Sequence, residues 1–581
     1  MKALRLVWPW ARPYWFVAAA GALASVVGVL INLTIPLLTS RIIDDGIAVQ
    51  DSSTVLRTAL LMVAIIIAGV AASAVASLLS VRFAFHAVTD LRGDLFSHVQ
   101  HLSFGNLDRL TSGEILTRLT SDVSKVTTLL TIGVTFVVQI PVSFIGALIA
   151  IVVLDLSLVP IVFVMVPAIG VLVWFVISRS SVLYDLVQSR LDRLNTVVQE
   201  NLQGAEVIKA FVRQDHEIDR FDTAAGELAH DATLVNQLVA TLFPWLILLS
   251  SLGIAAVLWI GGGNVINGDL SPGDLVAFIQ FMAFISFPMM FFAFLQPLLS
   301  AAGASMKRIV DVMDQRADVM VAEDGHDLPT SEGPLDIEFA EVSFDYRADT
   351  PAHDCVLNDI NLRIAGGTTV AILGATGSGK STLVNLIPRF YDATYGSVRV
   401  GDIDVRELNK SSLRRNIGIA LQEPHLFSGS VADNLRFGRP DATNDEIIAA
   451  AKAAQAHEFV VAMDGGYEAK IEQGGANLSG GQRQRLAIAR TLVVAPKVLI
   501  FDDSTSAVDL ETEAEIQEVF DTLTDVTVIL VAQRITTALG ADVIVLLDDG
   551  RVAAQGTHAE LLLTSPIYQE IYRSQLGEPA L

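Results

Sequence analysis

Hydrophobic and polar positions divide this chain into an apolar first half and a mixed second half. The first half contains six long stretches that lack Asp, Glu, Lys and Arg, and a helix needs about 20 mostly apolar residues to cross a bilayer. Each stretch is long enough, so the pattern predicts six transmembrane helices. The stretches are Pro13–Ser40, Thr58–Val81, Val126–Leu154, Leu156–Ser178, Ala232–Gly268 and Leu275–Met306.

The charged segments between these spans are also predicted to be helical. They lie near Arg82–Lys125 and Arg179–Asp231, and the first places Leu91, Leu95 and Val99 at helical spacing. We therefore expect the spans to continue as helices beyond the bilayer and to turn back there.

Basic residues predict the orientation. Both charged segments are rich in Lys and Arg, whereas the opposite side carries only Arg41 and Arg57. The positive-inside tendency places both termini in the cytoplasm. Met1–Pro13, with its tryptophans and basic residues, is predicted to be a short interfacial helix.

The predicted sixth span is rich in aromatic residues and methionine. Phe278, Phe281 and their neighbours could line an adaptable cavity for a hydrophobic substrate, or they could simply pack or face lipid. Gln280, Ser286 and Gln296 are better candidates for facing a cavity, because polar groups that face lipid are costly.

Composition narrows the function classes. Hydrophobic residues make up 52% of the 581 residues and charged residues 18%, against about 25% charged in an average soluble protein. This excludes a disordered chain and disfavours a purely soluble enzyme. The single cysteine, Cys355, excludes an intrachain disulfide and is expected to be a buried or half-buried thiol.

Charge is distributed unevenly along the chain. Residues 1–312 carry 18 basic and 22 acidic side chains, a net charge of −4, and the remainder carries 21 and 41, a net charge of −20. Nucleic-acid binding requires basic surface, so this balance argues against a nucleic-acid partner.

The second half contains a phosphate-binding loop. The apolar run Thr368–Leu373 predicts a strand, and Gly374-Ala375-Thr376-Gly377-Ser378-Gly379-Lys380-Ser381 follows at once and leads into a predicted helix. The pattern matches G-x-x-x-x-G-K-[ST], whose backbone N–H groups cradle phosphates. Lys380 is expected to reach the β- and γ-phosphates, and the Ser381 hydroxyl to hold Mg²⁺.

Two further pieces complete a nucleotide site. The predicted strand Val498–Phe501 ends in Asp502-Asp503, where an acid that orients Mg²⁺ belongs in such a protein. Between this strand and the loop lies Leu478-Ser479-Gly480-Gly481-Gln482, whose consecutive glycines allow backbone amides to approach an anion closely.

The loop, the glycine-rich signature and the acidic strand, in this order behind six spans, resemble an ATP-binding cassette (ABC) half-transporter of the exporter type. The resemblance implies a multi-pass α-helical membrane domain with six transmembrane helices, followed by an α/β P-loop NTPase domain of the ABC ATPase type. It places the membrane domain at residues 1–312, a linker at 313–333 and the nucleotide-binding domain at 334–581.

The resemblance also implies roles for individual residues. Tyr346 would stack on adenine, Gln422 would sense Mg²⁺, and the signature would cap the ATP held by the opposite subunit. Ser506-Ala507-Val508-Asp509 resembles a dimer-contact loop, and Gly105–Leu110 and Gly204–Phe211 resemble coupling helices. The catalytic candidates are Lys380, Gln422, Asp503 and Gln533; the Mg²⁺ candidates are Ser381, Gln422 and Asp502; the ATP-binding candidates are Tyr346, Gly374, Ala375, Thr376, Gly377, Ser378, Gly379, Lys380, Ser381, Thr382, Ser479, Gly480, Gly481 and Gln482.

Two positions depart from the family pattern. Asp503 stands where the family has a glutamate that polarises the attacking water, and Gln533 stands where it has a histidine that contacts the γ-phosphate. A smaller departure is Glu472-Gln473, where exporters have Gly-Glu. The alternative is neutral drift, with both residues working adequately, but both larger changes fall on one catalytic step while the phosphate loop and signature are intact. They predict a site that binds ATP and hydrolyses it slowly, hence a heterodimer with a competent partner.

The resulting prediction is an ATP-driven exporter subunit for hydrophobic or amphipathic drugs, lipids or peptides, in the inner membrane of a bacterium. Two alternatives stay open: a regulatory subunit or channel gated by ATP as a ligand, and an importer of siderophores with the exporter fold. Near-zero ATPase with preserved gating would favour the first alternative.

Overall fold

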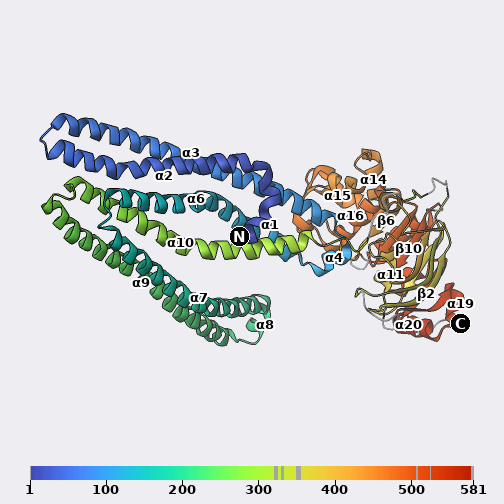
Figure 1. Ribbon diagram of the computed structural model, residues 1–581. Helices are drawn as coiled ribbons and strands as arrows, with labels where there is room; N and C mark the ends of the chain where they lie inside the picture. The colour runs from blue at the N-terminus through green and yellow to red at the C-terminus, as the bar shows by residue number, and fades with distance from the viewer. Residues whose placement is uncertain are drawn as a thin grey trace. The chain divides into compact units, whose positions relative to one another are not determined.

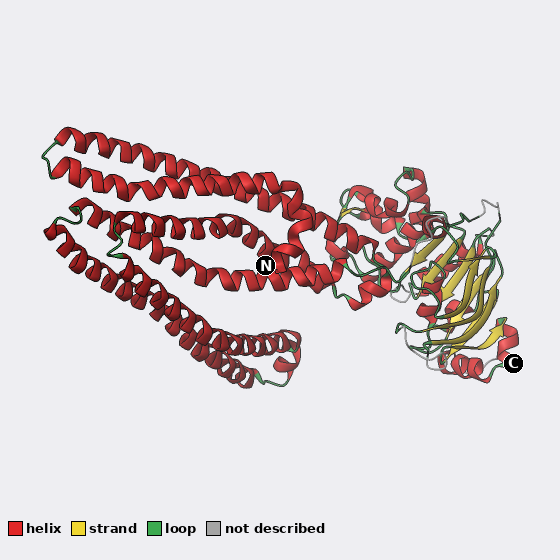
Figure 2. Cartoon of the chain, viewed as in Figure 1, coloured by secondary structure: helices red, strands yellow, loops and turns green. Residues whose placement is uncertain are grey.

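The computed structural model describes residues 2–319, 325–328, 333–347, 355–504, 508, 510–523 and 525–576, without the side chains of residues 2–4, 134, 286–297, 510 and 521. The chain forms two compact units. The first consists of Met1–Gln100 with Ser112–Gln315, and the second of His101–Thr111 with Arg316–Leu581. The first is helical and the second contains both helices and strands (Figure 2).

Long helices build the first unit, and most of each predicted span lies within one of them (Figure 1). Five of these helices are long and apolar enough to cross a membrane within the described residues; α10 adds the shorter apolar stretch Pro272–Ile285. The elements are α1 (Lys2–Ala11), η1 (Arg12–Tyr14), α2 (Trp15–Arg41), η2 (Ile42–Ile47), α3 (Ser52–His101), α5 (Ser112–Thr117), η3 (Arg118–Asp122), α6 (Val123–Leu154), α7 (Val159–Gln203), α8 (Ala205–Ala210), α9 (Gln214–Asn267) and α10 (Pro272–Met313).

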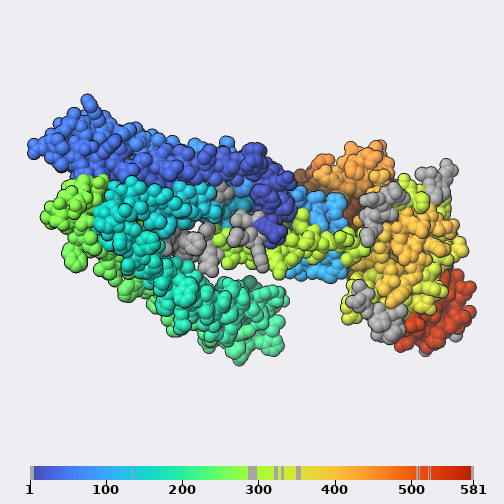
Figure 3. Space-filling model, in the orientation of Figure 1, coloured from blue at the N-terminus to red at the C-terminus, as the bar shows by residue number. Residues whose placement is uncertain are grey.

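The helices continue past the predicted spans, as the spacing of apolar residues indicated. α7 and α9 run side by side, with α8 at their turn, and this end forms a lobe of the unit (Figures 1 and 3). Arg190 of α7 pairs with Glu227 and Asp231 of α9 at 2.7 and 3.2 Å. The predicted span Leu156–Ser178 begins too early, because Asp155 ends α6 and its carboxylate accepts a hydrogen bond from the backbone of Ser157.

The aromatic residues of the sixth predicted span pack inside the first unit where they are described. Phe278 and Phe281 are fully buried, and Met282 is nearly so, within one hydrophobic core. This favours packing over a cavity for these residues. Ser286 and Gln296 lie outside the described side chains.

Two sheets organise the second unit. An antiparallel sheet has the order β2-β1-β4-β5, and a six-stranded sheet has the order β12-β11-β3-β10-β9-β6, parallel except for β12. The strands are β1 (Ile337–Phe344), β2 (Leu357–Ile364), β3 (Thr369–Leu373), β4 (Tyr395–Val400), β5 (Ile403–Asp404), β6 (Ile417–Ala420), β7 (Gly429–Ser430), β8 (Lys470–Ile471), β9 (Val498–Asp502), β10 (Thr527–Val531), β11 (Val543–Asp548) and β12 (Arg551–Gly556).

Helices surround these sheets. They are α4 (Phe104–Arg109), α11 (Lys380–Leu386), α12 (Lys410–Arg415), α13 (Val431–Leu435), η5 (Arg436–Gly438), α14 (Asn444–Ala453), α15 (His457–Ala462), η6 (Gly466–Glu468), η7 (Gln473–Gly475), α16 (Gly480–Val493), α17 (Leu510–Asp521), α18 (Ile535–Ala538), α19 (His558–Thr564) and α20 (Pro566–Leu576). Cys355 is buried and forms no disulfide, as predicted. The domain boundaries predicted above stay a prediction, because residues 320–324 and 329–332 of the linker lie outside the described residues.

Candidate active site

Parallel strands bring the separate sequence motifs to one edge of the six-stranded sheet. Val531 of β10 pairs with Asp502 of β9 on one side and with Ile372 of β3 on the other. The carboxyl ends of parallel strands meet at the same edge of a sheet. The phosphate loop, Asp502-Asp503 and the segment that carries Gln533 therefore all lie at this edge. The strands are buried, which explains why their sequences are continuous apolar runs.

The phosphate loop depends on its glycines. Gly377 and Gly379 have positive φ angles of +87° and +96°. A Cβ atom on Gly379 would lie 2.7 Å from Cδ2 of Leu357, whereas one on Gly377 would meet nothing within 4 Å. One side of the loop is therefore closed by packing, and α11 begins at its last two residues, Lys380 and Ser381.

Lys380 is held inside this loop. Its Nζ donates to the carbonyl oxygens of Gly374 and Ala375 at 2.9 and 2.8 Å. Burial lowers the pKa of Lys380, and the charges of Asp503 and Asp502 oppose that shift. An ammonium group placed here, near the start of a helix, is suited to bind phosphate oxygens.

Two of the three residues predicted to hold Mg²⁺, Ser381 and Asp502, are in direct contact. The Ser381 hydroxyl donates to Oδ1 of Asp502 at 2.9 Å, and burial, with a further contribution from Asp503, raises the pKa of Asp502. Among the described residues, the buried hydroxyls of Ser378 and Ser504 have no hydrogen-bond partner. Hydroxyl, carboxylate and amide oxygens are hard ligands of the kind that Mg²⁺ prefers, so these residues fit a Mg²⁺-bound nucleotide.

The two residues that depart from the family pattern lie in direct contact. Nε2 of Gln533 donates to Oδ2 of Asp503 at 2.9 Å, and Nε2 of Gln422 reaches the same oxygen at 3.5 Å. Asp503 adopts a positive φ of +48°. Burial raises its pKa, and Lys380 and the Gln533 hydrogen bond partly offset that increase. The structure thus brings together three of the predicted catalytic residues, while their roles stay predictions.

Tyr346 contacts α11, the helix that follows the phosphate loop, and a second tyrosine. Its hydroxyl hydrogen-bonds to that of Thr382 at 3.0 Å, and its ring lies edge to face with Tyr391 at 5.2 Å. The hydroxyl of Tyr391 donates to Asp108 of α4 at 2.6 Å. The predicted coupling helix Gly105–Leu110 corresponds to α4 and belongs to this unit. Sequence reasoning missed Tyr391, because an aromatic residue beside charged ones does not specify its partner.

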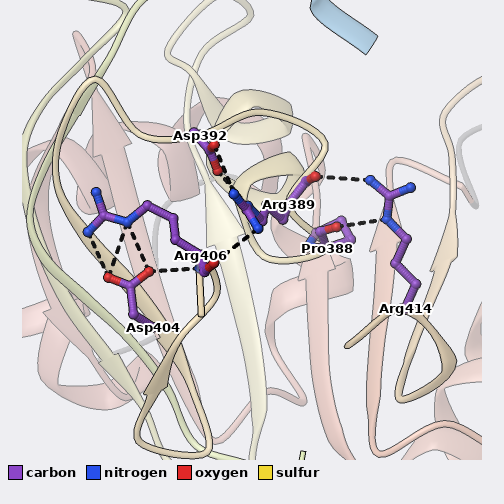
Figure 4. Close-up of polar contacts among 6 residues, drawn as sticks. All are labelled: Pro388, Arg389, Asp392, Asp404, Arg406 and Arg414. Carbon is purple, nitrogen blue, oxygen red and sulfur yellow. Dashed lines mark hydrogen bonds and ion pairs between the residues drawn. The ribbon is translucent and has the colours of Figure 1, made fainter. Parts of the chain in front are cut away.

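Two arginines fix the turn that carries Tyr391. Arg414 donates to the carbonyl oxygens of Pro388 and Arg389 at 3.1 and 2.9 Å, and Arg389 pairs with Asp392 at 2.7 Å (Figure 4). The Arg414 guanidinium also lies 5.1 Å from the centre of the Phe390 ring. Burial lowers the pKa of Arg414 to about 10, so it remains charged at neutral pH.

The glycine-rich signature forms the start of α16. Ser479 caps this helix: its hydroxyl accepts from the backbone N–H of Gln482, whose side-chain oxygen accepts from the N–H of Ser479. Among the described residues, no hydrogen bond joins Leu478–Gln482 to Gly374–Ser381. Ser506, Ala507 and Asp509 of the predicted dimer-contact loop lie outside the described residues, and the other predicted coupling helix, Gly204–Phe211, contains α8.

Comparison with known proteins identifies both units. Residues 18–289 match the ABC transporter transmembrane region and residues 357–506 match the ABC transporter family. The chain is 36% identical to the ABC transporter ATP-binding protein YfiB of Bacillus subtilis, over 97% of each chain. It is 32% identical to YgaD of the same species, named as a multidrug export ATP-binding/permease protein, over 99% of this chain and 100% of that one.

A solved structure is similar along nearly the whole chain. It is a bacterial Atm1-family ABC exporter with ATP bound, with a TM-score of 0.81 and 26% identity over 97% of this chain and 99% of that one. The chain therefore belongs to the ABC transporters of the exporter type, with a transmembrane domain and an ABC ATPase domain whose ATP hydrolysis is coupled to transport.

Proposed function

We propose that this chain is one subunit of a heterodimeric exporter in the cytoplasmic membrane, with both termini in the cytoplasm. Its own phosphate loop binds ATP and hydrolyses it slowly, and its signature completes the active site of a second, catalytically competent half-transporter. The cargo is a hydrophobic or amphipathic drug, lipid or peptide. The observation that carries this proposal is the contact between Asp503 and Gln533 at the position of the water-activating group.

The first reason is the reach of the carboxylate. Asp503 is one methylene shorter than the glutamate of the family pattern, so its carboxylate stands back by about 1–1.5 Å. A misplacement of about 1 Å can lower a rate by about 100-fold. The same carboxylate oxygen already accepts hydrogen bonds from Gln533 and Gln422, which hold it within the protein.

The second reason is the neutral amide of Gln533. A histidine can carry a positive charge, whereas an amide can only donate a hydrogen bond, so it stabilises developing negative charge less well. Binding does not depend on these two positions, because Lys380, Ser381 and the loop backbone supply the phosphate contacts. The site is therefore expected to retain affinity for ATP while its turnover is low.

The residues proposed to hold Mg²⁺ are Ser381, Gln422 and Asp502. When bound, this ion would neutralise charge that develops during phosphoryl transfer. Lys380 would bind the same phosphates, and Tyr346 would stack on the adenine once its hydroxyl leaves Thr382.

The proposal is tested by purifying the chain alone and together with candidate partner subunits, then measuring assembly and transport-coupled ATP turnover. We expect efficient turnover only in the mixed complex. A stable homodimer that transports at full rate would contradict the heterodimer.

ATP could instead act as a regulatory ligand, because the amide-bound Asp503 is consistent with no turnover at this site. The observation that separates the two functions is the turnover of the mixed complex. ATP-dependent gating without hydrolysis at either site would favour the regulatory subunit.

A further inference from the structure

The C-terminal helix α20 lies against the segment that carries Gln533. Tyr568 of α20 is fully buried, and Ile571 and Tyr572 pack on the same core, which contains Ala532 and Ile535. Residues 568, 571, 572 and 575 share one face of a helix. Because Tyr568, Ile571 and Tyr572 pack into the core on this face, the same face directs Gln575 toward the end of β10.

Gln575 bonds to the main chain on both sides of Arg534. Its Nε2 donates to the carbonyl oxygen of Gln533 at 3.0 Å, and its Oε1 accepts from the N–H of Ile535 at 2.8 Å. A single side chain thereby fixes the backbone at two points, two residues apart. The side chain of Gln533, set by this backbone, donates to Asp503.

A pocket of about 300 Å³ separates α20 from the phosphate loop. Its lining includes Gly374 and Thr376 of the loop, Ile571 and Gln575 of α20, and Gln533. The Gln575 bonds add direct polar contacts to the main chain of the Gln533 segment, beside the apolar packing of α20 on Ala532 and Ile535.

We propose that Gln575 is a positioning residue for ATP hydrolysis: through the backbone of Gln533 and Ile535 it holds the residue that contacts the γ-phosphate in line with Asp503. The inference rests on the proposed function, because it assumes that Gln533 occupies the γ-phosphate position. It predicts that a change in α20, away from the nucleotide, alters the rate of hydrolysis and leaves nucleotide affinity intact.

The test compares Gln575→Ala with Gln569→Ala in the full-length chain assembled with a partner subunit whose own phosphate loop has been inactivated, so that turnover reports on the site built from this chain's phosphate loop. Gln569 is a matched control, because it lies on the same helix and its Nε2 donates to a backbone carbonyl, that of Leu562, at 2.8 Å. We expect Gln575→Ala to lower kcat about 3- to 10-fold with less than a twofold change in KM. Gln569→Ala should leave both unchanged.

A third variant separates positioning from loss of folding. Gln575→Glu retains the acceptor for the Ile535 N–H and loses the donor to the Gln533 carbonyl, so its kcat should lie between those of wild type and Gln575→Ala. All variants are also measured in the background Asp503→Glu with Gln533→His, which is expected to raise turnover at this site.

The outcomes distinguish the two proposals. If the double replacement fails to raise turnover, the slow-site proposal is wrong, and Gln575 is then judged from the wild-type background alone. Equal effects of Gln575→Ala and Gln569→Ala on kcat, or an effect of Gln575→Ala on KM alone, would overturn the positioning role.

Discussion

Replacing Asp503 with Glu restores the residue type of the family, yet we expect it to recover little activity by itself. The longer side chain extends the carboxylate by about 1–1.5 Å. In the native chain the Gln533 amide nitrogen lies only 2.9 Å from the Asp503 oxygen. The added methylene therefore pushes the carboxylate toward that amide, which continues to bind it.

The expected change in the rate of ATP hydrolysis follows from these distances. A carboxylate placed correctly should recover about 100-fold in rate, which corresponds to about 2.7 kcal/mol of activation free energy. A hydrogen bond to a charged group is worth about 1.5–3 kcal/mol, so the Gln533 amide can retain most of that gain. We expect less than a threefold increase for Asp503→Glu, and about 100-fold for Asp503→Glu combined with Gln533→His.

The assay measures ATP turnover of the mixed complex with a partner subunit whose own phosphate loop has been inactivated. Turnover then reports on the site built from this chain's phosphate loop. Gln533→His alone completes a double-mutant cycle, which isolates the coupling between the two positions. An increase with Asp503→Glu alone that matches the double replacement would refute the reasoning.

Three further results are expected. Burial raises the pKa of Asp503 and the Gln533 hydrogen bond lowers it, so Gln533→Ala should raise that pKa further and move the acid limb of the pH–rate profile to higher pH. Gly379→Ala should weaken ATP binding at least 10-fold and lower the thermal unfolding temperature, because its Cβ would meet a leucine at 2.7 Å at a positive φ; the control Gly540→Ala, with open space around it, should do neither. Tyr391→Phe removes the hydrogen bond to α4, so transport per ATP hydrolysed should fall while ATP affinity, measured by titration, is retained.

The transmembrane helices were predictable because the absence of charge over a sufficient length is a strong signal in one dimension. The phosphate loop was predictable for a related reason: its residues are contiguous, so spacing alone specifies the geometry. Helix ends were less predictable, as the start of α7 shows. Leu156 and Leu158 are apolar, yet the chain turns there because the Asp155 carboxylate accepts a hydrogen bond from the backbone of Ser157.

Contacts between distant segments could not be read from spacing. Tyr391 bonds to Asp108 across 283 residues, and Gln575 reaches the Gln533 carbonyl across 42. Neither residue belongs to a motif, and neither residue type indicates a buried partner, because glutamine is mostly exposed and tyrosine is intermediate in burial. Only the fold, which brings α4 and α20 together with the rest of the second unit, assigns them partners.

The contact between Asp503 and Gln533 changes how their two departures from the family pattern are interpreted. In the sequence they are separate substitutions, 30 residues apart, and each could have drifted independently. In the fold, Asp502 pairs with Val531 in parallel strands, and this pairing fixes the distance between Asp503 and Gln533. Each of these two side chains is therefore in contact with the other. In the proposed slow site, the shorter acid leaves room for the amide donor, and the hydrogen bond between them sets the position of the acid. The pair therefore acts as one unit, in which reversal of either residue alone leaves the other in conflict with it.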